Sequence, residues 1–120
     1  MTDLVFVYGT LRGGGSNHWR MENATSIGTA KILGMLFRVD HYPALIPDDT
    51  QGAVTGEVYR TDSDLLGRLD DYEGDQYTRV LHRVTLEDAA QIEVWLWRWN
   101  RPMAGLERIP GGDWLEAAGG

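Results

Sequence analysis

The chain has 120 residues, the usual size of one compact domain, and contains no cysteine. Disulfide bonds, thiol nucleophiles and cysteine-based zinc sites are therefore excluded. Eighteen acidic and eleven basic side chains give a formal charge of −7, and no basic run interrupts this balance. We expect no nucleic-acid or membrane-surface partner, because both are anionic.

We expect a single domain over residues 1–116, followed by a frayed tail at 117–120. The first apolar run, residues 4–8, is far shorter than the roughly 20 residues that a membrane span requires. The basic segment and the small-residue cleavage site of a secretory signal are also missing. These observations predict a cytoplasmic protein.

Short apolar runs rich in β-branched and aromatic residues recur along the chain, separated by Gly, Pro, Asn and Asp. This pattern predicts a mainly β fold, and the 15 glycines, about twice the usual frequency, are typical of a turn-rich chain. The predicted strands are at about 3–8, 26–39 with a break near Gly34, 53–60, 77–87 and 91–100. The last two form a predicted hairpin.

One segment, from about Asp62 to Tyr72, has a clear helical period. Thr61 and Asp64 resemble a capping box at its start, and Gly74 is a suitable stop. The two-proline segment at 42–47 is interpreted as a rigid crossover in which Tyr42 could line a pocket. The segment from residue 100 onward mixes turn signals with large apolar residues, so we expect it to wrap over the barrel.

The last predicted strand is apolar on both faces, with Trp95, Trp97 and Trp99 on one of them. Such a strand belongs at the centre of a small barrel, covered on both sides. The tryptophans could instead form a binding platform or a subunit interface. Core packing is favoured, because aromatic residues on strands most often bury area.

A glycine-rich loop follows the first predicted strand, with the sequence VYGTLRGGGS at 7–16. Successive N–H groups in such a loop can hold a carboxylate or a phosphate, or stabilise an oxyanion. It is not a nucleotide-binding loop, because the Walker A and Rossmann spacings are absent. The competing interpretation is a flexible hairpin turn, and the residues alone leave both open.

Four acidic residues crowd the predicted C-terminal end of the helix, in the sequence DDYEGD at 70–75. Carboxylates gain nothing from the helix dipole at that end, so stability does not explain them. A carboxyl desolvated there would have its pKa raised toward neutrality, as a general acid/base requires. Glu73 is the best-placed candidate, and a solvated acidic turn is the alternative.

Other candidate sites are weaker. The histidines, His18, His41 and His82, have no i,i+4 spacing and no HExxH motif, so we expect no metal site. Ser16 near His18 suggests a nucleophilic triad, but no nucleophile-elbow sequence surrounds the serine.

Two segments together resemble the γ-glutamylcyclotransferase-like superfamily: FVYGTLR at 6–12, and LDDYEG at 69–74 followed by YTR at 77–79. The resemblance is closest to its γ-glutamylamine cyclotransferase branch with its small uncharacterised bacterial relatives, and it covers most of the chain. It implies an α+β, mainly β fold: a small mixed β-barrel with one or two short helices. A cavity at one end of the barrel would be formed by the YGTL-type loop.

By position, the resemblance implies that Tyr8, Gly9, Thr10 and Leu11 bind substrate and that Glu73 is the acid/base residue. The implied reaction converts a small γ-glutamyl amine or peptide to 5-oxoproline and a free amine, through attack by the substrate's own α-amine. No metal, thiol or cofactor is required.

The alternative is a non-catalytic module that binds a γ-glutamyl or other small carboxylate ligand. A purely structural or interaction role has less support, because it leaves the glycine loop and the acidic cluster unexplained. A monomer is expected, although the five tryptophans would permit a homodimer.

Overall fold

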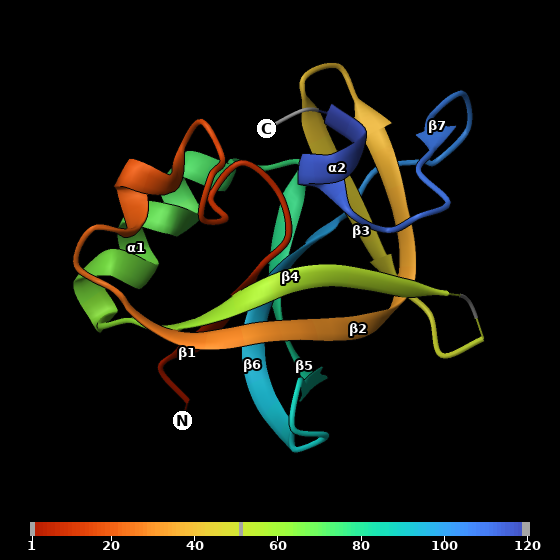
Figure 1. The fold of residues 1–120 in the computed structure, drawn as a ribbon. Helices are drawn as coiled ribbons and strands as arrows, with labels where there is room; N and C mark the ends of the chain where they lie inside the picture. Colours follow the sequence, from red (N-terminus) through yellow and green to blue (C-terminus); the bar gives the residue numbers. More distant parts are fainter. Residues whose placement is uncertain (1, 51, 119–120) are drawn as a thin grey trace.

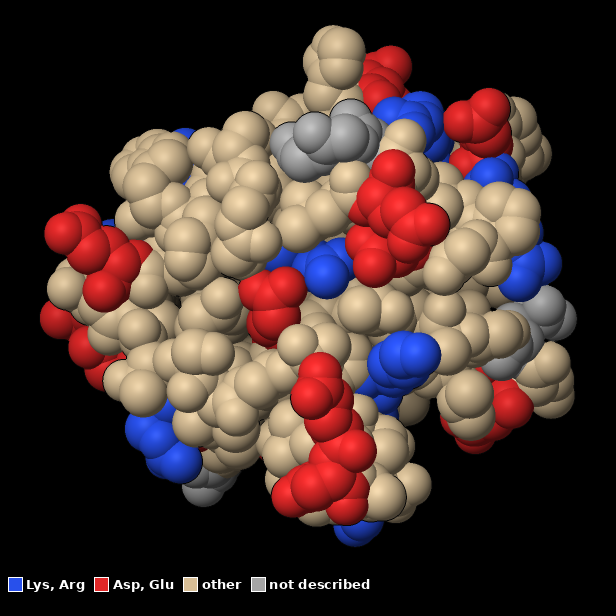
Figure 2. All heavy atoms as spheres, in the orientation of Figure 1, with Lys and Arg blue, Asp and Glu red and all other residues tan. Residues whose placement is uncertain are grey.

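The computed structural model describes residues 2–50 and 52–118 (Figure 1). In chain order the elements are β1 (Leu4–Val7), the 3₁₀ helix η1 (His18–Met21), β2 (Thr25–Val39), β3 (Tyr42–Pro47), β4 (Ala53–Arg60), α1 (Ser63–Glu73), β5 (Tyr77–Leu86), β6 (Gln91–Trp99), β7 (Glu107–Arg108) and α2 (Trp114–Ala118). No helix within the described ranges is long and apolar enough to cross a membrane. Figure 2 shows acidic and basic side chains interspersed over the face in view.

Five strands close into a barrel in the order β2, β4, β1, β6 and β5, with β5 returning to β2. The sheet is mixed, because β1 runs antiparallel to β4 and parallel to β6. Closure rests on two residue pairs, Ala30 with Leu86 and Lys31 with Thr85. The predicted fold class, a small, mainly β mixed barrel with short helices, is confirmed.

β2 is one continuous strand, so the predicted break near Gly34 is wrong. Residues up to Leu33 pair with β4, and residues from Gly34 onward pair with β3. A Cβ atom on Gly34 would lie 2.7 Å from the carbonyl oxygen of Ile46, so glycine lets β3 approach closely here. The glycine marks a change of partner along the strand.

The two-proline segment forms β3, and the prediction of a crossover is wrong. In the described sheet β3 lies at the end of the strand order, paired with β2. Proline has no N–H to donate to a ladder, and an edge strand tolerates that loss. The turn between β2 and β3 consists of Asp40 and His41, and Asp40 has a φ of +51°.

α1 begins at an aspartate cap and ends at a glycine. The Asp62 side chain accepts a hydrogen bond from the Leu65 N–H at 2.8 Å. The capping box predicted at Thr61 is wrong, because the Thr61 hydroxyl donates to the Asp3 carbonyl at 2.7 Å. Gly74, with a φ of +78°, ends the helix as predicted.

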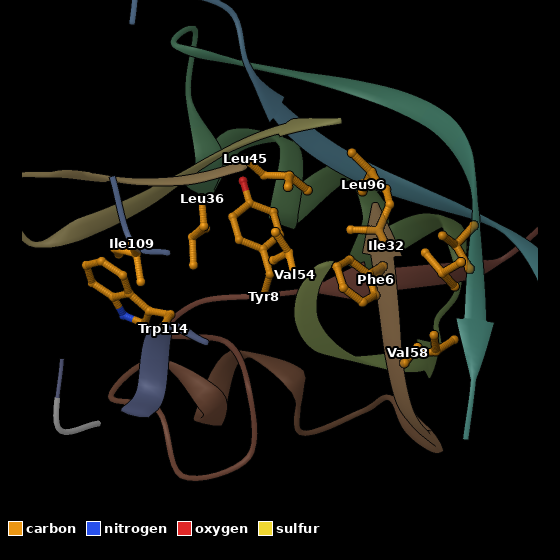
Figure 3. Close-up of a cluster of buried hydrophobic side chains, with 13 residues drawn as sticks. Phe6, Tyr8, Ile32, Leu36, Leu45, Val54, Val58, Leu96, Ile109 and Trp114 are labelled. Atoms are coloured by element: carbon orange, nitrogen blue, oxygen red, sulfur yellow. The ribbon is translucent and has the colours of Figure 1, made fainter. Parts of the chain in front are cut away.

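The barrel interior holds the main hydrophobic cluster, shown in Figure 3, which includes Phe6, Tyr8, Ile32, Leu36, Leu45, Val54, Val58, Leu96, Ile109 and Trp114. Side chains on the opposite faces of β1 and β6 pack against α1 instead. Trp97 is 3% exposed and packs in the cluster that contacts α1, and Trp99 is 4% exposed and packs with Phe37 and Ala44. Trp95 is half-buried. The prediction that the tryptophans pack in the core is confirmed.

The C-terminal segment returns to the barrel, as the sequence predicts. β7 pairs with β2, and Ile109 and Trp114 insert into the interior cluster. The Gly112 carbonyl accepts a hydrogen bond from the Thr55 N–H of β4 at 2.8 Å. α2 includes residues 117 and 118 of the expected frayed tail, and residues 119–120 lie outside the described residues.

Gly112→Ala tests how tightly this segment is seated on β4. A Cβ atom there would lie 2.0 Å from the Ala53 carbonyl oxygen, and the φ of +67° is left-handed. We expect a loss of about 2 kcal/mol or more in the free energy of unfolding, measured by chemical denaturation. Gly111→Ala is the control: its Cβ meets nothing within 4 Å, so the change should stay within about 0.5 kcal/mol. Equal denaturation midpoints for the two variants would contradict this account.

Candidate functional site

A cavity of about 360 Å³ lies where β1 runs into the glycine loop. Its walls come from that loop, the β2–β3 turn, the end of α1 and the adjoining residues of β5 and β6. The lining residues are Phe6, Val7, Tyr8, Gly9, Thr10, Leu11, Val39, Asp40, Tyr42, Pro43, Tyr72, Glu73, Gln76, Tyr77 and Trp97. The structure therefore brings all the site residues predicted from the sequence into one cavity. Their roles stay predictions.

Glu73 is the last residue of α1 and is half-buried. Burial, and to a smaller extent the charge of Asp70, raise the pKa of Glu73 from its ordinary 4.5 to about 7. Its neighbours Asp71 and Asp75 are exposed, as a solvated acidic turn would have them. Glu73 differs from them, and its pKa is in the range that suits a general acid/base at cellular pH.

Asp70 lies one helical turn before Glu73 and is held by two donors. Its Oδ1 accepts a hydrogen bond from the Trp97 indole Nε1–H at 2.9 Å and lies 3.0 Å from the Arg79 Nε. The Arg79 guanidinium in turn lies over the Trp95 ring, 4.5 Å from its centroid. These contacts fix a carboxylate beside Glu73.

Four tyrosines line the cavity, and the phenol groups of three of them, Tyr8, Tyr72 and Tyr77, make hydrogen bonds that hold their positions. The Tyr8 hydroxyl donates to the Trp97 carbonyl at 2.5 Å, and the Tyr77 hydroxyl donates to the Pro43 carbonyl at 2.5 Å. Burial, followed by the charge of Glu73, raises the pKa of both phenols well above the usual value. The Tyr72 hydroxyl lies 3.1 Å from the Thr10 Oγ1, so it joins the helix to the loop. The cavity is therefore lined by neutral phenols.

The glycine loop is held in shape by its own hydrogen bonds. The Arg12 N–H donates to the Gly9 carbonyl at 3.1 Å, and the Asn17 N–H donates to the Thr10 carbonyl at 2.9 Å. The loop does not join a hairpin, because β1 pairs with β4 and β6 and not with the next strand. The interpretation as a hairpin turn is therefore wrong.

Gly9, Thr10 and Leu11 line the cavity, and none of the described residues accepts a hydrogen bond from their backbone N–H groups. A Cβ atom on Gly9 would lie 2.4 Å from the Pro43 Cγ, so only glycine lets the loop pass this close to β3. Free N–H groups in such a turn can bind a carboxylate or an oxyanion.

Arg12 ties the loop to the rest of the molecule, a role that the sequence analysis missed. Its buried guanidinium lies 2.8 Å from the Glu57 Oε2 of β4 and 2.9 Å from the Asp113 Oδ1 before α2. Glu57 also accepts hydrogen bonds from the Gly13 N–H at 2.7 Å and the Tyr59 hydroxyl at 3.0 Å. A basic residue inside a glycine loop was the available signal, but its partners are 45 and 101 positions away.

Residues 2–50 and 52–118 contain no group of three or more His, Cys, Asp or Glu side chains that could hold a metal ion. The His18 Nδ1 lies 2.9 Å from the Leu11 carbonyl oxygen, so this imidazole supports the loop. The chemistry available in the cavity comes from one carboxyl of raised pKa, neutral phenols and backbone N–H groups.

Asp70→Asn tests the electrostatic origin of the Glu73 pKa. We expect the pKa of Glu73 to fall below 7 and stay above 4.5, because burial, the larger cause, remains. The measurement is an NMR titration of the Glu73 side-chain carboxyl carbon. Asp71→Asn, an exposed neighbour outside the cavity lining, removes the same charge and should leave this pKa unchanged. Equal shifts in both variants would contradict the assignment.

Known proteins are similar in sequence to this chain over most of its length. Residues 5–116 match the family described as Gamma-glutamyl cyclotransferase, AIG2-like. The Gamma-glutamylcyclotransferase family protein YtfP of Escherichia coli strain K12 is 39% identical over 116 residues, which cover 93% of this chain and 96% of that protein.

Solved structures of other proteins share the fold. An uncharacterised protein from Pyrococcus horikoshii has a TM-score of 0.76 at 28% identity, over 97% of this chain and 92% of that one. An AIG2-like protein from Mus musculus has a TM-score of 0.75 at 25% identity, over 90% of this chain and 86% of that one. The resemblance drawn from the YGTL and YEG segments is confirmed, and the chain belongs to the γ-glutamyl cyclotransferase, AIG2-like family.

Proposed function

We propose that this protein converts a small γ-glutamyl amine or peptide to 5-oxoproline and a free amine, as a cytoplasmic monomer without a cofactor. One observation carries the proposal: Glu73, with a pKa raised to about 7, lines the same cavity as three loop residues whose N–H groups have no acceptor in the described part of the chain. Family membership supports the reaction class.

The proposed reaction needs no nucleophile from the protein. The α-nitrogen of the substrate attacks its own γ-carbonyl carbon, a carbon–nitrogen bond forms, and the bond to the departing amine breaks. The α-nitrogen begins as an ammonium and ends as a lactam N–H, so it loses two protons. The departing nitrogen begins as an amide N–H and ends as an ammonium, so it gains two. A carboxyl with a pKa near 7 can accept and return these protons.

Glu73 would act first as a base toward the α-ammonium and then as an acid toward the departing nitrogen. A carboxylate of ordinary pKa would be a weak base for the first step, and a carboxyl of much higher pKa would not be ionised at neutral pH. The pKa near 7 permits both roles in one turnover. The reverse order of roles does not arise, because attack must precede departure.

The loop N–H groups would bind negative charge on the substrate. Those of Gly9, Thr10 and Leu11 could bind the α-carboxylate or the oxyanion that forms on the γ-carbonyl oxygen. Holding the substrate curled, with the α-nitrogen against the γ-carbon, removes most of the entropic barrier to ring closure. The phenols of the buried Tyr8 and the half-buried Tyr77 line this part of the cavity.

Glu73→Gln tests the proposal in a panel of γ-glutamyl amines and peptides, with 5-oxoproline release as the measurement. We expect at least a 100-fold loss of kcat, because proton transfer to and from a positioned group is removed. Asp71→Asn, which removes an exposed charge on the same helix, should keep wild-type turnover. Wild-type turnover in Glu73→Gln would remove this residue from the mechanism.

The same pair of proteins separates an enzyme from a binding module. Ligand binding by wild type and Glu73→Gln, with no 5-oxoproline from either, would replace the proposed reaction by recognition of a γ-glutamyl or other small carboxylate ligand. Release of 5-oxoproline by wild type alone supports the enzyme.

The pH dependence has a defined sign. For wild type, kcat/KM should fall about tenfold per pH unit below 7, because the protonated carboxyl cannot accept a proton.

The raised pKa of Glu73 also makes the stability of the fold depend on pH. The stability that protonated Glu73 contributes is complete below its ordinary pKa of 4.5 and is lost as the pH rises through 7. Glu73→Gln should therefore be more stable than wild type at pH 8 and equally stable at pH 4. A pH-independent difference in stability would contradict the burial of this carboxyl.

A further inference from the structure

Asp40 lines the same cavity as the residues to which the sequence analysis assigned roles. It is the first residue of the two-residue turn between β2 and β3, and its φ of +51° is left-handed. Aspartate and asparagine tolerate this conformation better than other residues with a side chain, which accounts for the backbone. It does not account for a carboxylate placed on the cavity wall.

The Asp40 carboxylate has no partner within the described part of the chain. No hydrogen bond or ion pair involves its side chain there, and the residue is exposed. The other aspartates near the cavity differ: Asp70 is held by Trp97 and Arg79, and Asp75 lies 3.9 Å from Arg101. An unpaired carboxylate on a cavity wall is available to bind a cation.

The charged residues that line the cavity are both acidic, Asp40 and Glu73. Two arginines beside the cavity are engaged with other groups. The Arg20 guanidinium stacks 4.3 Å and 4.2 Å from the ring centroids of Trp19 and Tyr72, and Arg79 pairs with Asp70. Neither guanidinium belongs to the cavity lining, so the cavity presents a negative charge to its ligand.

Asp40 and the neighbouring Tyr42 lie at an exposed part of the cavity. Tyr8 and Leu11 are 6% and 4% exposed, whereas Tyr42, next to the β2–β3 turn, is 50% exposed. In the proposed reaction the glutamyl part must reach Glu73 and the loop N–H groups. The departing amine, which varies between substrates and must leave, then lies toward Asp40 and Tyr42.

We propose that Asp40 is a specificity-determining residue that binds a second positive charge on the departing amine. This inference rests on the proposed function and deepens it: preferred substrates are γ-glutamyl derivatives of diamines, and a leaving group that ends in a carboxylate is disfavoured. Asp40 takes no part in proton transfer. It acts on the part of the substrate that the reaction releases.

Three substrates with a common four-carbon leaving group test this inference: γ-glutamyl-1,4-diaminobutane, γ-glutamyl-butylamine and γ-glutamyl-4-aminobutanoate. Only the terminal group differs, being an ammonium, a methyl group or a carboxylate. For wild type we expect kcat/KM for 5-oxoproline release to be about fivefold higher with the ammonium than with the methyl group, a modest ratio because the ion pair is exposed. The carboxylate substrate should have the lowest kcat/KM, and added salt should reduce the differences in kcat/KM among the three substrates.

Asp40→Asn should remove this ranking and leave kcat/KM for γ-glutamyl-butylamine within about twofold of wild type. Asparagine suits the left-handed turn, so the variant should fold, and a melting temperature verifies this. Asp71→Asn, which changes the net charge equally from outside the cavity, should keep the wild-type ranking.

The experiment distinguishes failure of the Asp40 inference from failure of the proposed function. Equal kcat/KM for the three substrates in wild type, or an unchanged ranking in Asp40→Asn, would overturn the role of Asp40 and leave the proposed reaction standing. No 5-oxoproline from any of the three, with the protein folded, would overturn the proposed function and this inference with it.

Discussion

Removal of the Glu73 carboxyl from water is the constraint on which the rest of the site depends. The carboxyl stands at the C-terminal end of α1, where the helix dipole also disfavours negative charge, and Asp70 adds a like charge one turn away. Burial, and to a smaller extent the charge of Asp70, bring the pKa of Glu73 to about 7, at a cost in stability. Other contacts of α1 offset that cost: its buried apolar face packs against the barrel, and the Trp97 indole N–H donates a hydrogen bond to Asp70.

A second constraint is the shape of the glycine loop, which must keep its N–H groups free at the cavity. Besides its own hydrogen bonds, the loop is held by contacts with the rest of the molecule, because Arg12 binds Glu57 on β4 and Asp113 before α2. Gly112 and Trp114 pack the C-terminal segment against the barrel, and this segment positions Asp113 for its contact with Arg12 of the glycine loop. Interactions of this kind join residues more than 100 positions apart, so the cavity exists only in the complete fold.

Local pattern predicted the regular elements well, because strand alternation and helix period are properties of neighbouring residues. It failed where a tertiary contact decides: Gly34 marks a change of partner, and the prolines of β3 are tolerated because that strand lies at an edge. Glu73 was found through its motif and its unfavourable place on the helix. Arg12 and Asp40 were missed, because the first acts through distant carboxylates and the second through a turn that forms the cavity wall.

The central claim is that the substrate's own α-amine, and not water, displaces the departing amine from the γ-carbonyl. It is tested most directly by turnover of a γ-glutamyl amine in H₂¹⁸O with mass analysis of the glutamyl product. The account predicts 5-oxoproline with no oxygen from solvent, because the ring closes before water can enter. Glutamate carrying one ¹⁸O atom would contradict it and would identify the protein as a hydrolase.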